Sequence, residues 1–210
     1  MPKLSLLTVE QLCFERDDRH VFEPIDFTVD SGEIMQVEGP NGSGKTTLMR
    51  LLTTALQPTS GTIIYAGQPI ALCRYEYLSD ILYIGHQPAV KMNLTAEENL
   101  RWMATDCIDS ARDALSAVGL AGYDDVPCYN LSAGQQRRVA LGRLFMTNAK
   151  LWFLDEPFTA IDKQGVSLLE NCLREHVNRG GAVVLSTHQD LAIDGVRKTV
   201  CVPHADQGAL

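Results

Sequence analysis

The sequence predicts an α/β protein with a three-layer core around a mainly parallel sheet, an N-terminal antiparallel β layer and an inserted α-helical subdomain. The parallel sheet is predicted from continuous apolar runs, such as residues 151–154 and 182–185, that alternate with helical segments, because strands covered on both faces are apolar throughout. Residues 4–13 and 21–29 mix apolar and polar side chains and predict the antiparallel layer. Residues 95–118 contain two successive helical stretches with no clear strand between them, which predicts the helical subdomain.

The length of 210 residues fits a single domain with a sizeable core. We expect residues 1–210 to form this domain, with a core lobe over about residues 1–87 and 147–210 and a helical lobe over about residues 88–146. The content of 45% hydrophobic and 21% charged residues is typical of soluble globular proteins. The apolar runs are far shorter than a bilayer span, and residues 1–10 lack the pattern of a secretory signal, so we expect a cytoplasmic chain.

Net charge and cysteine spacing argue against several classes of protein. The formal net charge of −8 argues against a nucleic-acid partner, because a basic face dominates the affinity for nucleic acids. The six cysteines form no C-x-x-C pair, and none is paired with a histidine at the spacing of a metal site. Cys201 and His204 lie close together, but two potential ligands alone make neither a metal site nor a haem site. We therefore expect reduced thiols and a plain C-terminal tail.

The secondary-structure elements follow from local pattern. Residues 4–13 are predicted to form an edge strand, and residues 15–20 a charged turn. In the strand at residues 21–29, Pro24 indicates an edge position or a bulge. Residues 95–98 (TAEE) match a capping box at the start of a helix. The other predicted elements are strands at residues 33–38, 62–65, 81–84, 151–154, 182–187 and 196–202, and helices at residues 47–55, 95–103, 109–118, 139–146 and 164–178.

The segment GPNGSGKTT at residues 39–47 fits the phosphate-binding pattern G-x-x-x-x-G-K-[ST]. A triphosphate needs many donors at close range, and glycines permit the positive φ and close approach with which backbone amides supply them. The N-terminus of the following helix adds a dipole that attracts anions. A strand, a glycine-rich loop and a helix occur here in the expected order. The predicted loop residues are Gly39, Pro40, Asn41, Gly42, Ser43, Gly44, Lys45, Thr46 and Thr47.

Five side chains are predicted to act on the bound phosphates, the metal or the attacking water. Lys45 would place its ammonium against the β- and γ-phosphates, and Thr46 and Asp155 would hold Mg²⁺. Glu156 follows directly and is a candidate general base for water attacking the γ-phosphate. His188 follows another apolar strand. Because the carboxyl ends of parallel strands line one crevice, we expect Lys45, Glu156 and His188 to form a single site.

Two polar segments leave alternatives open. Gln87 lies at the joint between the predicted core and helical lobes, where it either reaches the metal and the attacking water or belongs to a solvated turn. Residues 131–135 (LSAGQ) open a helix, with Ser132 and Gly134 where donors would face an anion. The alternative for this segment is an ordinary N-cap. Nothing else on the chain needs a second phosphate-binding turn.

Taken together, these motifs resemble those of the ATP-binding-cassette (ABC) ATPases, P-loop NTPases, over the whole length and in the same order. The signature motif in particular is peculiar to that superfamily. Residues 39–47 are similar to the Walker A loop, Gln87 to the Q-loop, residues 131–135 to the signature motif, residues 151–156 to Walker B with its catalytic glutamate, residues 157–162 to the D-loop, and His188 to the switch histidine.

Within the superfamily, residues 84–88, 93–100, 151–165 and 187–191 are similar to the ATPase subunits of cytochrome c maturation, historically called haem exporters. The resemblance implies ATP and Mg²⁺ as ligands and hydrolysis linked to haem handling or to release of a haem-loaded chaperone. It also implies a homodimer that docks on an integral membrane subunit at the cytoplasmic face of the inner membrane. In such a dimer Ser132, Gly134 and Gln135 would close over the nucleotide of the other copy, and force would pass through Gln87 and the helical lobe.

The chain departs from the superfamily at the position that stacks on the base. ABC ATPases usually have a tyrosine about six residues before the position of Phe22, and this chain has Arg16 there, with Phe14 two residues earlier. An arginine plane stacks on a ring system with about 0.5–1 kcal/mol at an exposed site. We expect Arg16 or Phe14 to contact the base, and GTP to be tolerated better than usual.

Three other classes share part of this motif set. A subunit of another ABC exporter, for lipids or drugs, has every catalytic motif and differs only in its partner. Soluble ABC proteins that act on DNA or ribosomes usually have tandem cassettes or coiled-coil insertions, and this sequence has neither. A P-loop kinase has no use for residues 131–135 and would need a lid-like run of arginines. An exporter subunit for cytochrome c maturation remains the preferred interpretation.

Overall fold

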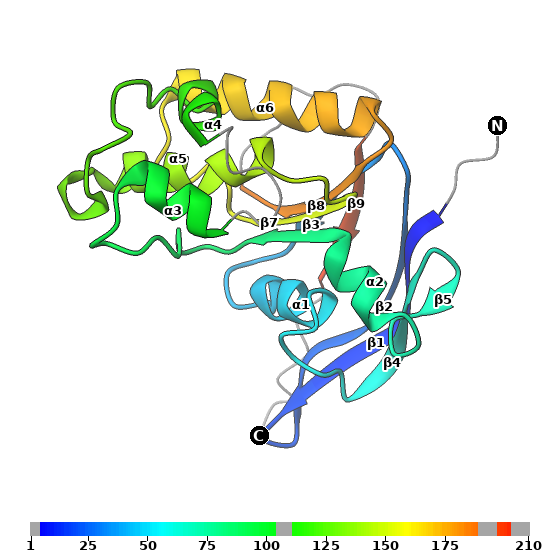
Figure 1. Ribbon diagram of the computed structural model, residues 1–210. Coiled ribbons are helices and arrows are strands. Elements are labelled where there is room, and N and C mark those ends of the chain that lie inside the picture. Colours follow the sequence, from blue (N-terminus) through cyan, green and yellow to red (C-terminus); the bar gives the residue numbers. More distant parts are fainter. Residues whose placement is uncertain (1–4, 104–110, 189–196, 203–210) are drawn as a thin grey trace.

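A computed structural model describes residues 5–103, 111–188 and 197–202, and within these ranges it confirms the predicted α/β architecture (Figure 1). The first sheet contains β3 (Ile34–Glu38), β6 (Ile81–Ile84), β7 (Leu151–Asp155), β8 (Ala182–Ser186) and β9 (Arg197–Cys201). Their order is β6-β7-β8-β3-β9, and all four pairings are parallel. Every residue of β7 and β8 is buried, which explains the continuous apolar runs in their sequences.

The second sheet is antiparallel and contains β1 (Ser5–Arg16), β2 (Arg19–Asp30), β4 (Ser60–Tyr65) and β5 (Gln68–Pro69). Its order is β2-β1-β4-β5. The expectation that residues 4–13 form an edge strand was wrong, because β1 pairs with β2 on one side and with the distant β4 on the other. The edge position falls to β2, as Pro24 indicated, and the β1–β2 register is shifted beside this proline. The predicted charged turn is shorter than expected and consists of Asp17 and Asp18.

Six α-helices and two short 3-10 turns belong to the described residues. They are α1 (Lys45–Leu52), α2 (Arg74–Ser79), α3 (Ala96–Met103), α4 (Ala111–Ala117), α5 (Ala133–Gly142), α6 (Lys163–Asn178), η2 (Cys128–Asn130) and η3 (Arg143–Phe145). The capping box before α3 is confirmed, since the Thr95 N–H donates to Glu98 Oε2 at 2.8 Å and the Glu98 N–H donates to Thr95 Oγ1 at 3.1 Å. Helix α2 was not predicted, because Tyr77 is its one buried residue and the helix has no apolar stripe. Residues 4, 109, 110 and 196 of the predicted elements lie outside the described ranges.

The parallel sheet lies between α3, α4, α5 and α6 on one side and α1 on the other (Figure 1). It separates two apolar cores. Trp152 and Leu154 of β7 face the core that includes side chains of α3, α4, α5 and α6. Leu151 and Phe153 face the core that includes α1, α2 and the antiparallel sheet, because successive side chains of a strand point to opposite faces. With both faces covered, the carboxyl edge of the sheet is the place where a ligand can reach the strands.

His176 of α6 is packed flat on Trp152, with ring centroids 3.6 Å apart and an interplanar angle of 8°. Its Nε2 lies 3.2 Å from the carbonyl oxygen of Lys150. Burial lowers the pKa of His176 from its ordinary value of 6.5 to about 4. The folded protein therefore retains the neutral imidazole over a range of pH in which an unfolded chain would protonate it.

We expect the free energy of unfolding to fall as the pH falls from about 6.5 towards about 4, because the unfolded chain takes up a proton at His176 that the folded chain does not bind. This contribution is fully present above the ordinary pKa of histidine. The substitution His176→Phe keeps a flat ring against Trp152 and removes the proton uptake. Urea unfolding at about pH 7.5 and about pH 5 should show a smaller loss of stability in the variant. Equal losses in the two proteins would contradict this assignment.

Candidate nucleotide-binding site

A cavity of about 560 Å³ lies where the phosphate-binding loop meets the carboxyl edge of the parallel sheet. Lys45 and Thr46 line it from the start of α1, Asp155 and Glu156 from the end of β7, and His188 from the segment after β8. The structure thus brings together five of the six side chains that the sequence indicated for phosphate, metal and catalysis, and the sixth, Gln87, is not in the lining. This placement follows from the parallel sheet, whose strand ends meet at one edge.

Glycines shape the loop between β3 and α1. Gly42 and Gly44 have φ angles of 84° and 100°, a backbone region that favours glycine. A Cβ at Gly44 would also lie 2.8 Å from a side-chain carbon of β2, so a larger residue would collide with the hairpin. Lys45 Nζ donates hydrogen bonds to the carbonyl oxygens of Gly39 at 2.7 Å and Pro40 at 3.1 Å. Two carbonyl groups of the loop therefore hold the ammonium of Lys45, a residue that lines the cavity.

Asp155 is 2% exposed and lies between two hydroxyl groups. Thr46 Oγ1 donates to its Oδ2 at 2.9 Å, and Ser186 Oγ donates to its Oδ1 at 2.7 Å. These contacts place a carboxylate and the Thr46 hydroxyl side by side at the cavity, and oxygen ligands of this kind fit Mg²⁺. The sequence did not single out Ser186, although a hydroxyl at the end of an apolar strand two residues before His188 was visible in it.

Glu156 has a φ angle of 52°, in the left-handed region that residues other than glycine seldom adopt. Its N–H donates to the carbonyl oxygen of Ser186 at 3.1 Å and to Ser186 Oγ at 3.0 Å, which holds this conformation in place. The carboxylate Oε1 lies 3.5 Å from His188 Nε2. Backbone strain of this kind occurs at functional sites where the surrounding contacts maintain it. The structure thus pairs the predicted base with the predicted histidine.

Arg137 of α5 links two loops at the site, and sequence reasoning missed it. Its side chain is 2% exposed, and it donates to Gly85 O at 2.6 Å and to His86 O at 3.2 Å. The other terminal nitrogen donates to Asp155 O at 3.0 Å and to Glu156 O at 2.8 Å. Burial lowers the pKa of Arg137, which the carboxylates of Asp155 and Glu156 partly offset. An arginine two residues after the predicted signature turn was the available signal.

Several expected residues lie elsewhere in the described structure. Gln87 is exposed, and its neighbour His86 is the residue of that loop that lines the cavity. Arg16 is exposed at the end of β1, outside the cavity lining, and Phe14 is half-buried. Of the remaining loop residues, Asn41 and Thr47 line the cavity, whereas Ser43 is fully buried.

The segment at residues 131–135 begins α5 and forms a capping box. The Gln135 N–H donates to Ser132 Oγ at 3.2 Å, and the Ser132 N–H donates to Gln135 Oε1 at 2.9 Å. A Cβ at Gly134 would lie 2.5 Å from the carbonyl oxygen of Ala160, so this position tolerates no side chain. Ser132, Gly134 and Gln135 are not among the described residues that line the cavity of this copy. The N-cap interpretation is therefore correct locally, and it leaves a second role open.

Comparisons with known proteins agree on one family. The family described as ABC transporter matches residues 22–159. The cytochrome c biogenesis ATP-binding export protein CcmA of Pseudomonas putida is 53% identical over 184 residues, which cover 86% of this chain and 88% of that protein. The protein of the same name from Escherichia coli (strain K12) is 48% identical over 192 residues, covering 90% of this chain and 92% of the relative.

Solved structures of ABC transporter subunits share the fold. An ATP-binding subunit of an ABC transporter has a TM-score of 0.84 at 27% identity and covers 96% of this chain and 87% of its own. The cbiO1 subunit of Clostridium perfringens, part of the ABC transporter complex cbiONQ, has a TM-score of 0.73 at 27% identity, with 90% and 80% covered. This chain therefore belongs to the ABC transporter family and is an ATP-binding ATPase subunit. Among members of the family, it is similar to the CcmA proteins over about nine-tenths of its length.

We expect Arg137→Met to lower ATPase activity by at least about tenfold, because four backbone carbonyls around the cavity lose a charged donor and each such bond contributes about 1.5–3 kcal/mol. Arg137→Lys should recover part of the activity, since one ammonium can reach some of the four oxygens but lacks the planar fork. The control Arg179→Met removes an exposed arginine whose described ion pair is with Glu175, and it should retain wild-type kcat. A wild-type kcat in folded Arg137→Met would contradict the role.

Proposed function

We propose that the chain is the ATP-hydrolysing subunit of an ABC exporter that serves cytochrome c biogenesis. The observation that carries the proposal is the 53% identity to a CcmA protein over 86% of the chain, together with the intact pairs Thr46–Asp155 and Glu156–His188. Fold alone does not specify a partner, but identity at this level over nearly the whole chain supports the same partner class. Hydrolysis would be linked to haem handling or to release of a haem-loaded chaperone.

In the proposed mechanism the side chains of the cavity position ATP and remove a proton from water. Lys45, which now donates to two loop carbonyls, would turn its ammonium to the β- and γ-phosphates. Glu156 would orient the attacking water and accept its proton, and His188, 3.5 Å from that carboxylate, would lie against the γ-phosphate. Catalysis would rest mostly on positioning and electrostatics, since little covalent chemistry is required of the protein.

The oxygen donors of Thr46 and Asp155 fit Mg²⁺, which we propose as the cofactor. Their hydrogen bond of 2.9 Å shows that both reach one point at the edge of the cavity. When bound, the ion would neutralise charge on the phosphate oxygens. Gln87 is exposed and directly follows His86, which lines the cavity, and we propose it as a third contact to the metal or the attacking water.

We further propose that two copies form the working unit. The exposed turn with Ser132, Gly134 and Gln135 has a helix N-terminus suited to an anion, and no described phosphate site in its own copy uses it. In a homodimer it would close over the nucleotide held by the other copy. Arg16 or Phe14 would contact the base from the β1–β2 hairpin, which lies beside the loop through Gly44.

An integral membrane subunit is the proposed second partner. Apolar side chains are exposed beside a cavity of about 520 Å³ where α2 of the core lobe meets the helical lobe proposed at about residues 88–146. Tyr75 of α2 lines this cavity and is 82% exposed, and Trp102 of α3, which precedes the lining residue Met103, is 61% exposed. Large exposed apolar side chains of this kind mark interaction surfaces. Among the described residues, none of the helices has the length and apolar content to cross a membrane. We propose a peripheral location at the cytoplasmic face of the inner membrane.

Replacement of the chromosomal gene by a Glu156→Gln allele should abolish c-type cytochromes, because loss of the general base lowers hydrolysis by about a hundredfold or more. The variant should still co-purify with a multi-span membrane protein from solubilised membranes. The matched control Glu10→Gln changes an exposed carboxylate of β1 and should leave both readouts unchanged. Normal c-type cytochromes in cells whose ATPase activity is lost would reject the cytochrome assignment, and wild-type turnover by the variant would reject Glu156 as the base.

A further inference from the structure

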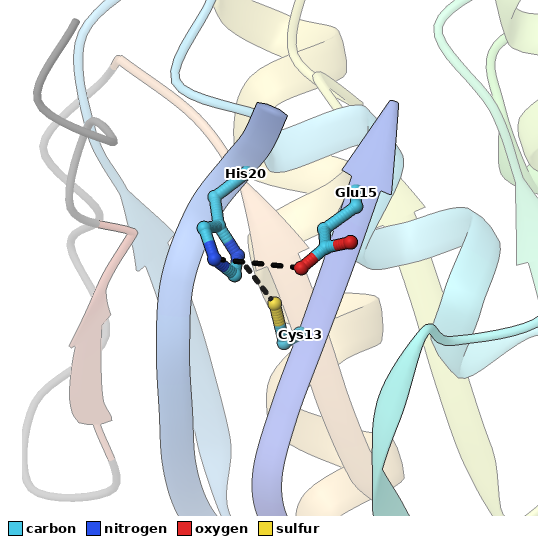
Figure 2. A group of neighbouring side chains, drawn as sticks. All are labelled: Cys13, Glu15 and His20. Carbon is cyan, nitrogen blue, oxygen red and sulfur yellow. Dashed lines mark hydrogen bonds and ion pairs between the residues drawn. The ribbon is translucent and has the colours of Figure 1, made fainter. Parts of the chain in front are cut away.

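Three potential metal ligands gather at the closed end of the β1–β2 hairpin, where Figure 2 shows them pointing toward one another. Cys13 and Glu15 lie two residues apart on β1, and His20 is the register partner of Glu15 on β2. Because side chains two residues apart on a strand share a face, the backbone alone places all three on one side of the hairpin. The sequence argued against a cysteine paired with a histidine, and the turn at Asp17 and Asp18 is what brings Cys13 to His20.

The side-chain atoms lie at distances close to those of a metal site. Cys13 Sγ is 2.9 Å from His20 Nδ1, and His20 Nε2 is 3.4 Å from Glu15 Oε1. One ligand atom from each residue lies within 4.8 Å of the other two. Two ligands on one zinc ion, a sulfur and an imidazole nitrogen, are about 3.6 Å apart. The distance between the sulfur and Nδ1 therefore has to increase by about 0.7 Å. Glu15, which faces the other ring nitrogen, has to turn toward the ion, and the side chains of His20 and Glu15 are 46% and 43% exposed.

Hydrogen bonds to Thr59 hold the backbone of the strand that carries Cys13 and Glu15. The Glu15 N–H donates to Thr59 Oγ1 at 2.9 Å, and the Thr59 N–H donates to Cys13 O at 2.9 Å. Asp17 and Asp18 have φ angles of 53° and 57°, as in the two-residue turns that close tight hairpins. The backbone positions of the ligand residues are thus set before an ion binds, which lowers the entropic cost of binding.

The burial and charge of the cluster also suit a cation. Cys13 is 2% exposed, so its sulfur is a ligand that is shielded from water. Glu15 and His20 lie on the solvent side of the cluster. The carboxylate of Glu15 would neutralise part of the charge of a bound divalent cation, which would displace the thiol proton of Cys13.

We propose that Cys13, Glu15 and His20 bind one thiophilic divalent cation of the Zn²⁺ class, with a fourth position open to solvent. A sulfur, an imidazole nitrogen and one carboxylate are the ligands from which zinc sites are built, whereas Mg²⁺ and Ca²⁺ take oxygen ligands. The ion would clamp the end of the hairpin at His20, whose neighbour Val21 lines the nucleotide cavity. The site is separate from the proposed magnesium ligands, which belong to α1 and β7.

Titration of the metal-free full-length chain with Co²⁺ tests the proposal, because a cobalt–thiolate bond produces a charge-transfer band in the near ultraviolet. We expect a band at one equivalent of Co²⁺ that Zn²⁺ abolishes. Cys13→Ser should remove the band, and His20→Asn and Glu15→Gln, which change half-exposed side chains, should each weaken Co²⁺ binding by at least about tenfold. The control Cys201→Ser removes an exposed thiol on β9 and should leave the titration unchanged.

Three results would overturn the proposal. One is the absence of a charge-transfer band in the wild-type chain. The second is a band that survives in Cys13→Ser, which would place the thiolate ligand elsewhere. The third is unchanged affinity in both His20→Asn and Glu15→Gln. The last two variants keep the test decisive if Cys13→Ser folds poorly, because neither changes a buried side chain.

Discussion

The buried carboxylate of Asp155 is the constraint on which the nucleotide site depends. Asp155 is 2% exposed, and burying a carboxylate costs free energy of folding unless it is hydrogen bonded. Thr46 and Ser186 each donate a hydrogen bond to one of its oxygens. These contacts tie the end of β7 to the start of α1 on one side and to the end of β8 on the other. The phosphate-binding loop is thereby positioned against the sheet by one acidic side chain, which also offers an oxygen ligand suited to Mg²⁺.

Arg137 extends this network into the helices. Its guanidinium is buried and donates four hydrogen bonds, all of them to backbone carbonyl oxygens of two loops. Among the described residues, no other side chain accepts a hydrogen bond from it. One loop carries His86 and Gln87, and the other follows Asp155. Because α5 begins with the turn at residues 131–135 and carries Arg137, this helix connects the turn to the loop that holds Glu156. In the proposed homodimer, the turn of one copy contacts the nucleotide that the other copy holds. That nucleotide would thus affect hydrolysis in both copies.

Much of the fold and of the site could be predicted because the relevant chemistry lies in contiguous residues. The loop at residues 39–47 and the carboxylates after an apolar strand carry their own local patterns. Arg137 and Ser186 were missed because their roles arise from contacts with segments 18 to 52 residues away, which no local pattern contains. The contact between Cys13 and His20 was not predicted because it depends on a two-residue turn at Asp17 and Asp18. The charge pattern alone predicts a turn over the whole stretch of residues 15–20. For the same reason β1 was predicted to be an edge strand, because its second partner, β4, comes much later in the chain.

In the proposed homodimer, each nucleotide site is completed by the turn at residues 131–135 of the second copy. The most direct measurement is disulfide formation between Asn41→Cys in one copy and Ser132→Cys in another, in a Cys201→Ser background with Glu156→Gln to retain ATP. Mixed chains should form a cross-linked dimer in the presence of Mg²⁺ and ATP, and little without nucleotide or with either new cysteine alone. Cross-linking that is absent with ATP, or equally strong without it, would contradict the shared site.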